Sequence, residues 1–306
     1  MSFTPSEFWK NFRLGTELSI SGNFIYNGLY SFDLMQHFYY EDEAFEFLYN
    51  ISVGIERLQK ICVVLIEHNE RTNQEDFEVS LISHNHDDLN IRIEKHKNIN
   101  LGKTHKKLLS LLAKFYKSSR YEMYQMQSVF QPNQAKSELI RFIEESLDIK
   151  ISTEMLGCSS NEFRIKKFIG KTIGKFCKEY YQIVKEECHR LGIFTYEIAS
   201  ESKAFKIFMS EKYDFSEERI IQKEILKHLI QNDLPKNFKN YIDSEPPLEL
   251  EFCNVNYYID YLFSFHKEYT IKGEIEELYT EIDNVKERLE YFKYLGNPDV
   301  RFEEEE

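Results

Sequence analysis

The stretch Ala44–His68, AFEFLYNISVGIERLQKICVVLIEH, decides the fold. Its spacing predicts one long helix whose apolar side chains occupy most of the circumference. These positions are Phe45, Phe47, Leu48, Ile51, Val53, Ile55, Leu58, Ile61, Cys62, Val64 and Leu65. Because a helix that is apolar nearly all round is buried among its neighbours, we expect it at the centre of a helical bundle.

Further helices are predicted on both sides of this one. They span Leu18–Tyr39, Leu101–Ser118, Lys136–Leu147, Asn161–Leu191, Ser202–Met209, Ser216–Asn232 and Glu274–Leu295, with a short one starting near Asp87 or Asp88. The chain of 306 residues has only 11 glycines and 6 prolines, which argues against an all-β fold with many turns. Two segments, Phe77–Ile82 and Leu248–Phe252, are β-like. The predicted fold class is therefore all-α, with at most one or two short strands.

The segment Ile149–Ser160 interrupts the helical pattern and is the best candidate for a domain boundary. We expect a helical domain at 1–150 and a helical C-terminal domain at 151–306. The last predicted helix carries an apolar seam at Ile275, Leu278, Ile282, Val285, Leu289 and Phe292. Such a seam fits either a dimerisation helix or an amphipathic helix folded on its own domain, and its short length favours the second.

Positive charge is concentrated in a chain whose net charge is −13. The run Arg92–Arg120 holds nine Lys or Arg residues and one acid, and Arg164–Lys178 holds six more and no acid. Segregation of this kind indicates an anionic partner, for which a phosphate backbone is the natural candidate. The helical spacing groups the lysines in two exposed stripes: Lys103, Lys107, Lys114 and Lys117, and Lys167, Lys171 and Lys175. The alternative is that both stripes are solvated helix faces.

No cofactor or metal motif is complete. Two Gly-Lys-Thr tripeptides, at 102–104 and 170–172, lack the glycine five residues earlier that a phosphate-binding loop needs. His84 and His86 lie beside two aspartates, but no further ligand cluster accompanies them. We therefore expect no cofactor and no metal. Five scattered cysteines without a C-x-x-C pair, no signal peptide and no long apolar run favour the cytoplasm and argue against a membrane segment.

Taken together, these segments resemble a HEPN domain over roughly residues 20–147. The resemblance is carried by Ile51–Val64 (ISVGIERLQKICVV), by His86–Leu89 (HDDL) with Asn85 where glycine is usual, and by the basic helix that leads to Arg120. The second half also resembles an extension found in a plasmid-encoded subgroup. The resemblance implies an all-helical protein of a prokaryotic antiviral or toxin–antitoxin module, usually a homodimer.

Active HEPN proteins cleave RNA without a metal through an R-x(4–6)-H motif. The resemblance places the motif arginine at Arg120, but positions 125–127 contain no histidine. Either a histidine is brought in by the fold, with His86 the first candidate and Tyr124 nearby, or the protein is a catalytically inactive sensor or adaptor that acts through protein–protein contacts. Arg120 has a structural alternative as well, stacking on Tyr121 or pairing with a buried carboxylate.

Overall fold

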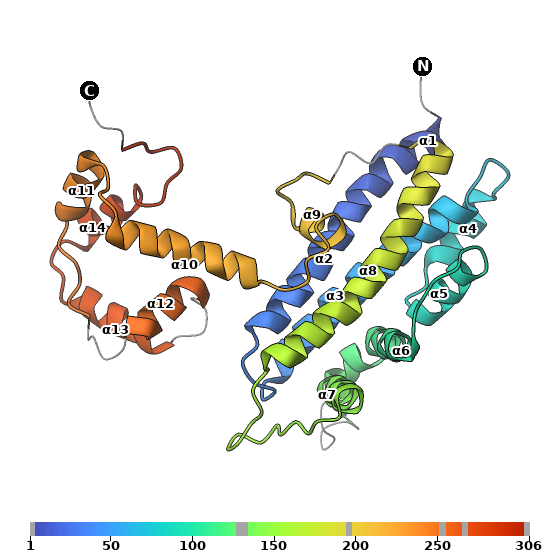
Figure 1. Cartoon of the computed structure of the whole chain (residues 1–306), viewed down its shortest axis with the longest axis horizontal. Helices are drawn as coiled ribbons and strands as arrows, with labels where there is room; N and C mark the ends of the chain where they lie inside the picture. The colour runs from blue at the N-terminus through green and yellow to red at the C-terminus, as the bar shows by residue number, and fades with distance from the viewer. Residues whose placement is uncertain (1–3, 127–133, 194–197, 251–254, 265–268, 303–306) are drawn as a thin grey trace. The chain divides into compact units, whose positions relative to one another are not determined.

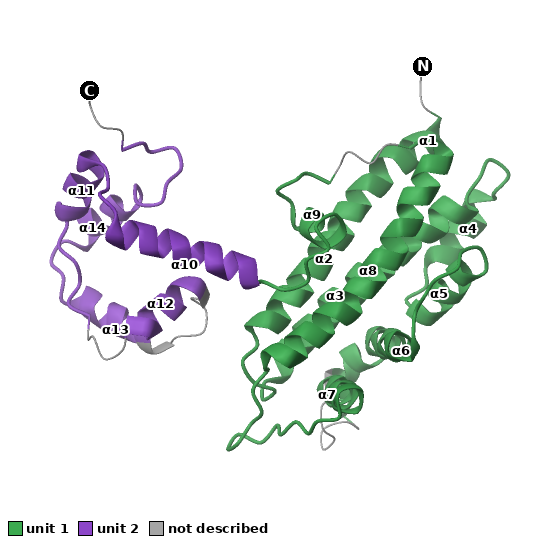
Figure 2. Ribbon diagram, in the orientation of Figure 1, with its two compact units in different colours: residues 1–215 green, residues 216–306 purple. Residues whose placement is uncertain are grey.

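The computed structural model describes residues 4–126, 134–193, 198–250, 255–264 and 269–302. Over these residues the chain is helical and contains no strand, so the all-α prediction is confirmed. The chain divides into two compact units, residues 1–215 and 216–306 (Figure 2).

Unit 1 is a bundle built on three long helices, α2, α3 and α8, which lie side by side (Figure 1). Its elements are α1 (Pro5–Phe8), the π-helical turn η1 (Trp9–Arg13), α2 (Leu14–Leu34), α3 (Glu41–Glu67), α4 (Gln74–Leu81), α5 (His86–Glu94), α6 (Lys103–Lys117), the 3-10 turn η2 (Ser119–Tyr124), α7 (Gln134–Leu147), α8 (Phe163–Leu191) and α9 (Lys203–Phe208). Unit 2 contains α10 (Ser216–Gln231), α11 (Lys236–Asp243), α12 (Val255–Ser264), α13 (Tyr269–Thr280) and α14 (Val285–Phe292).

Helix α3 is the central helix, as its apolar circumference predicted. It packs against α2, α5, α6, α7 and α8, and Ile51, Ile55 and Leu58 are completely buried. Gly54 allows the closest approach, since a Cβ atom there would lie 2.5 Å from Cγ1 of Ile25 on α2. The Ser21 hydroxyl donates to the Gly54 carbonyl at 2.8 Å and fixes the register of the two helices.

The division between the units lies at residue 215 and not near 150, because α8 is part of the first core. Tyr180 of α8 is fully buried, and its hydroxyl donates to Asn90 Oδ1 at 2.8 Å and accepts from Gln59 Nε2 at 2.9 Å. These bonds join α8 to α5 and α3. Ala204 of α9 packs so closely on α2 that a Cβ at Gly22 would lie 2.5 Å from it. Both helices therefore belong with the N-terminal bundle.

Three local predictions differ from the structure. The β-like segment 77–82 lies in and just after α4, which Asn73 caps by accepting from the Asp76 amide. Residues 248–250 form no strand, and the rest of that predicted segment lies outside the described residues. The predicted helix Glu274–Leu295 is interrupted between Thr280 and Val285, so α13 and α14 form no continuous heptad seam. In the described part of the chain, the one β-type pairing is the isolated bridge between residues 37 and 160.

No helix among the described residues is long and apolar enough to cross a membrane.

Candidate functional site

Helix α6 carries the first of the two lysine stripes, Lys103, Lys107, Lys114 and Lys117, and forms a groove with α7. Leu108, Leu112 and Phe115 anchor the other side of α6 in the core, which turns the lysines outward. The groove is open to solvent and has a volume of about 730 Å³. It is lined by Lys103, Lys106, Lys107, Ser110, Leu111, Lys114, Glu138, Arg141, Phe142 and Glu145. Five cations therefore face two carboxylates in one channel. Lys117 is exposed on α6 but does not line the groove.

The two carboxylates of the groove already hold two of its lysines. Lys107 Nζ lies 3.2 Å from Glu145, and Lys114 forms an ion pair with Glu138 across the same groove. Lys106 pairs with Glu94 of α5 at 3.3 Å. The groove is thus positively charged overall, but an anionic ligand must compete with internal carboxylates for part of that charge.

The second stripe runs beside this groove without lining it. At one end Arg164 of α8 donates to the Leu147 carbonyl of α7 at 3.1 Å. At the other end Lys175 pairs with Glu179 at 2.6 Å, and Glu179 accepts from the Asn100 amide just before α6. Two further lysines of this stripe, Lys167 and Lys171, are exposed, and Lys167 lies over the Phe163 ring.

Arg120 lies in η2, directly after α6, and stacks on two aromatic rings. Its guanidinium carbon lies 3.8 Å from the centroid of Tyr116 and 4.6 Å from that of Tyr121. Its Nε atom is buried and has no hydrogen-bond partner in the described part of the chain. Burial raises the pKa of Tyr116, and the neighbouring Arg120 charge opposes that rise. The predicted stacking on Tyr121 is present, together with a closer one on Tyr116.

His84 contacts the same tyrosine ring as Arg120. Its Nδ1 lies 3.1 Å from the Glu56 carboxylate, and its ring centroid lies 5.0 Å from that of Tyr116. The Glu56 side chain is only 8% exposed and is also bonded to Lys60 at 2.6 Å, whereas the His84 side chain is 47% exposed. A histidine that donates Nδ1–H to a buried carboxylate keeps Nε2 as a proton acceptor.

His86 and Tyr124 have different environments. The His86 ring is completely buried, its Nε2 lies 2.8 Å from the Ser52 carbonyl, and burial lowers its pKa. It contacts the same tyrosine, with ring centroids 6.4 Å apart, but solvent does not reach it. Tyr124 is 87% exposed on η2. Arg120 and His86 therefore contact the same tyrosine ring, but His84 is the one of these two histidines that faces solvent.

No pattern in the sequence indicates that His84 contacts Glu56 and Tyr116. Glu56 lies in the helix that was predicted to be buried, and His84 was considered only as a metal ligand without a further ligand cluster. In the described residues, no group of three or more His, Cys, Asp or Glu side chains is placed to hold a metal ion. No family model, curated protein or solved structure matches the chain.

Proposed function

We propose that unit 1 binds RNA along the α6–α7 groove and cleaves it without a metal at the cluster of Glu56, His84, Tyr116 and Arg120. One observation carries the proposal: a half-exposed histidine held by a buried carboxylate and an arginine guanidinium contact the same tyrosine ring, and this tyrosine lies on the helix that carries the lysines of the groove. This pairing supplies the two groups that an R-x(4–6)-H site needs, with the histidine coming from outside the motif.

In the proposed reaction, Nε2 of His84 accepts the proton of a ribose 2′-hydroxyl as its oxygen attacks the adjacent phosphorus. The bond from phosphorus to the 5′-oxygen breaks, which leaves a 2′,3′-cyclic phosphate and a 5′-oxygen that takes up a proton. The guanidinium of Arg120 stabilises the charge that develops on the phosphoryl oxygens. Glu56 is a positioning residue that holds the ring and stabilises its protonated form.

The test is cleavage of single-stranded RNA in the presence of a metal chelator. We expect wild type to give cyclic-phosphate ends, and R120A and H84Q to lose the activity while they still bind RNA. The matched control is H96Q, because His96 is exposed on the same unit and is not part of the cluster. Equal cleavage by wild type and R120A would remove Arg120 from the site, and no RNA binding at low salt would end the proposal.

A second candidate function is a non-catalytic sensor or adaptor that binds a protein. It is favoured by α10, whose Ile220, Ile221, Ile225, Leu229 and Ile230 are between 47% and 71% exposed. Exposed apolar surface of this kind is common at protein interfaces. Tight binding to a protein partner, without salt-dependent RNA affinity, would decide for it.

The proposed biological role and cellular compartment rest on the resemblance to HEPN domains and on the scattered cysteines. A HEPN-like protein of a prokaryotic defence or toxin module would act in the cytoplasm and commonly as a homodimer. The interruption between α13 and α14 removes the continuous helix that the dimerisation interpretation of the apolar seam requires. Sedimentation of the full chain would measure its oligomeric state directly.

A further inference from the structure

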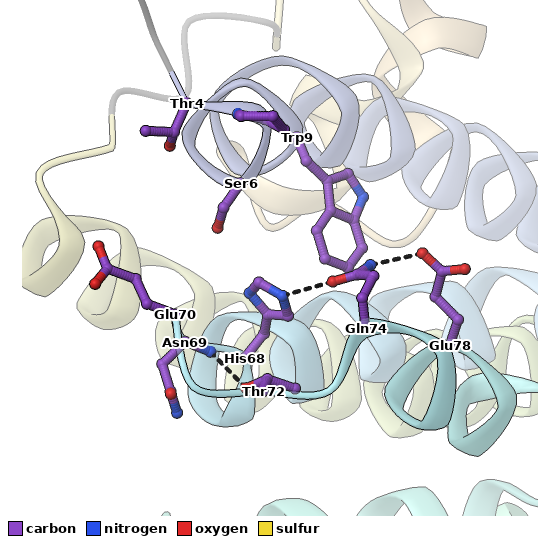
Figure 3. Close-up of a pocket in the computed structure, with 10 residues that line it drawn as sticks. Thr4, Ser6, Trp9, His68, Asn69, Glu70, Thr72, Gln74 and Glu78 are labelled. Carbon is purple, nitrogen blue, oxygen red and sulfur yellow. Dashed lines mark hydrogen bonds between the residues drawn. The ribbon is translucent and has the colours of Figure 1, made fainter.

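A second pocket lies at the other end of α3, away from the RNA site proposed above. It encloses about 820 Å³ between the N-terminal turns and the α3–α4 connection. Figure 3 shows Thr4, Ser6 and Trp9 on one side, and His68, Glu70 and Gln74 on the other. The volume falls within the range of about 300–1,000 Å³ that is usual for small-molecule sites.

The hydrogen bonds among the polar residues of this pocket leave one acceptor without a donor, Nδ1 of His68. Gln74 Nε2 donates to the Glu78 carboxylate at 2.6 Å, so the amide oxygen of Gln74 faces His68. That oxygen lies 2.9 Å from His68 Nε2, which must therefore carry the hydrogen. In the neutral ring, Nδ1 then holds a lone pair. His68 is 7% exposed, and its Nδ1 has no hydrogen-bond partner within the described residues. Figure 3 shows this edge of the ring turned away from Gln74, toward Ser6 and Glu70.

The side chains that line this pocket carry negative charge, which favours a cationic ligand. Two glutamates, Glu70 and Glu78, line the pocket, and no lysine or arginine does. Lys10 lies nearby, but its buried ammonium donates to the His68 carbonyl at 2.7 Å. The indole of Trp9 packs edge-to-face on His68, with ring centroids 5.1 Å apart, and extends into the pocket (Figure 3). An aromatic face beside carboxylates attracts cations, and an unpaired acceptor binds an N–H donor.

We propose that this pocket binds a small organic cation with N–H donors, such as a protonated amine or a guanidinium compound. The cation would lie against Trp9 and pair with Glu70 and Glu78, and an N–H group that enters beside the ring would donate to the buried Nδ1 of His68. This site is independent of the proposed RNA cleavage, because it uses none of the residues of the α6–α7 groove or of the Arg120 cluster.

Trp9 makes the test direct, because it is the one tryptophan of the chain. Its fluorescence in the full-length protein is followed while agmatine, pentanamide or pentanoate is added to about 10 mM, a range that detects dissociation constants near 1 mM. These probes are cationic, neutral and anionic. We expect a saturable change with agmatine alone, and a rise of the melting temperature at the same concentrations.

Substitutions in the pocket test whether its negative charge, and not only its folded structure, is needed to bind the cation. E70Q/E78Q keeps the acceptor for Gln74 and removes both charges, and we expect it to weaken agmatine binding at least about fivefold. The matched control is E75Q, because Glu75 is exposed on the same helix but does not line the pocket; its affinity should be unchanged. H68F tests the acceptor, and the double glutamine variant keeps the test valid if H68F does not fold. No response to agmatine, equal responses to all three probes, or full affinity in E70Q/E78Q would each overturn the proposal.

Discussion

Neutralising the two glutamates of the α6–α7 groove is predicted to tighten RNA binding. Glu138 and Glu145 line the groove and hold Lys114 and Lys107 in ion pairs. A phosphate that uses these ammonium groups must displace the carboxylates and also approach their negative charge. In the double variant E138Q/E145Q both costs disappear, while the size and hydrogen-bonding capacity of each side chain are nearly kept.

The magnitude follows from the exposure of the groups. Lys107 and Glu145 are 61% and 52% exposed, so their pair is worth only about 0.2–1 kcal/mol. Repulsion between a carboxylate and a phosphate about 6 Å apart in a water-like dielectric adds about 0.7 kcal/mol. Glu138 is the less exposed of the two, at 16%, and contributes at least as much. The two glutamates together therefore give at least about 1.8 kcal/mol, and we expect a gain in affinity of at least about twentyfold.

The assay is fluorescence anisotropy of a labelled single-stranded RNA at low and high salt. The gain should be present near 0.05 M salt and be lost near 1 M, where the screening length falls to about 3 Å. E201Q changes the net charge by half as much at an exposed glutamate that does not line the groove, and should leave the affinity nearly unchanged. Equal affinity of E138Q/E145Q and wild type at low salt would refute the assignment of this groove.

Four further outcomes are expected. R120A and H84Q should each lower the rate of RNA cleavage by about 10²–10⁴, measured with saturating protein, while the dissociation constant for RNA changes by less than about threefold. Gly54→Ala should lower the free energy of unfolding by about 1–3 kcal/mol in urea titrations, because its Cβ would press on Ile25. Tyr180→Phe should cost about 1–3 kcal/mol in the same assay, since the buried Asn90 oxygen loses its donor. Burial lowers the pKa of His86 in the folded protein, so the unfolded chain takes up this proton first as pH falls below about 6.5. Stability should therefore decrease from pH 7.5 to 5.5, and less steeply in His86→Gln.

The long helices were predictable because their periodicity is strong and continuous. The helix at Phe163–Leu191 begins two residues from its predicted start and ends at its predicted end. Helix α6 was predicted for the same reason, since its leucines and lysines occupy opposite faces. Short segments were less predictable. The sequence at 77–82 has β-like composition, but the Asn73 cap and the contacts of Phe77 with the core favour a helix.

Breaks inside an apolar pattern were the hardest feature to predict. The seam of the last predicted helix continues through Ile282, but Asp283 and Asn284 follow it directly. Both residue types form turns through their own side chains, and they separate α13 from α14. The domain boundary was also hard to predict, because a local break in the helical pattern does not show whether the next helix joins the same core. Residues 149–160 do interrupt the helical pattern, yet the buried hydroxyl of Tyr180 joins the following helix to the first core.

The cluster of Glu56, His84, Tyr116 and Arg120 was beyond prediction because core contacts far apart in the chain assemble it. Gln59 on α3 donates to the backbone carbonyl of His86 at 3.0 Å, and the His86 ring is bonded to the Ser52 carbonyl. These two bonds hold the start of α5 against α3. His84 lies two residues earlier, so the same attachment brings it to Glu56, 28 positions away in the chain. His86 therefore has a positional role, because this buried histidine fixes the loop that places His84 against Glu56 and Tyr116.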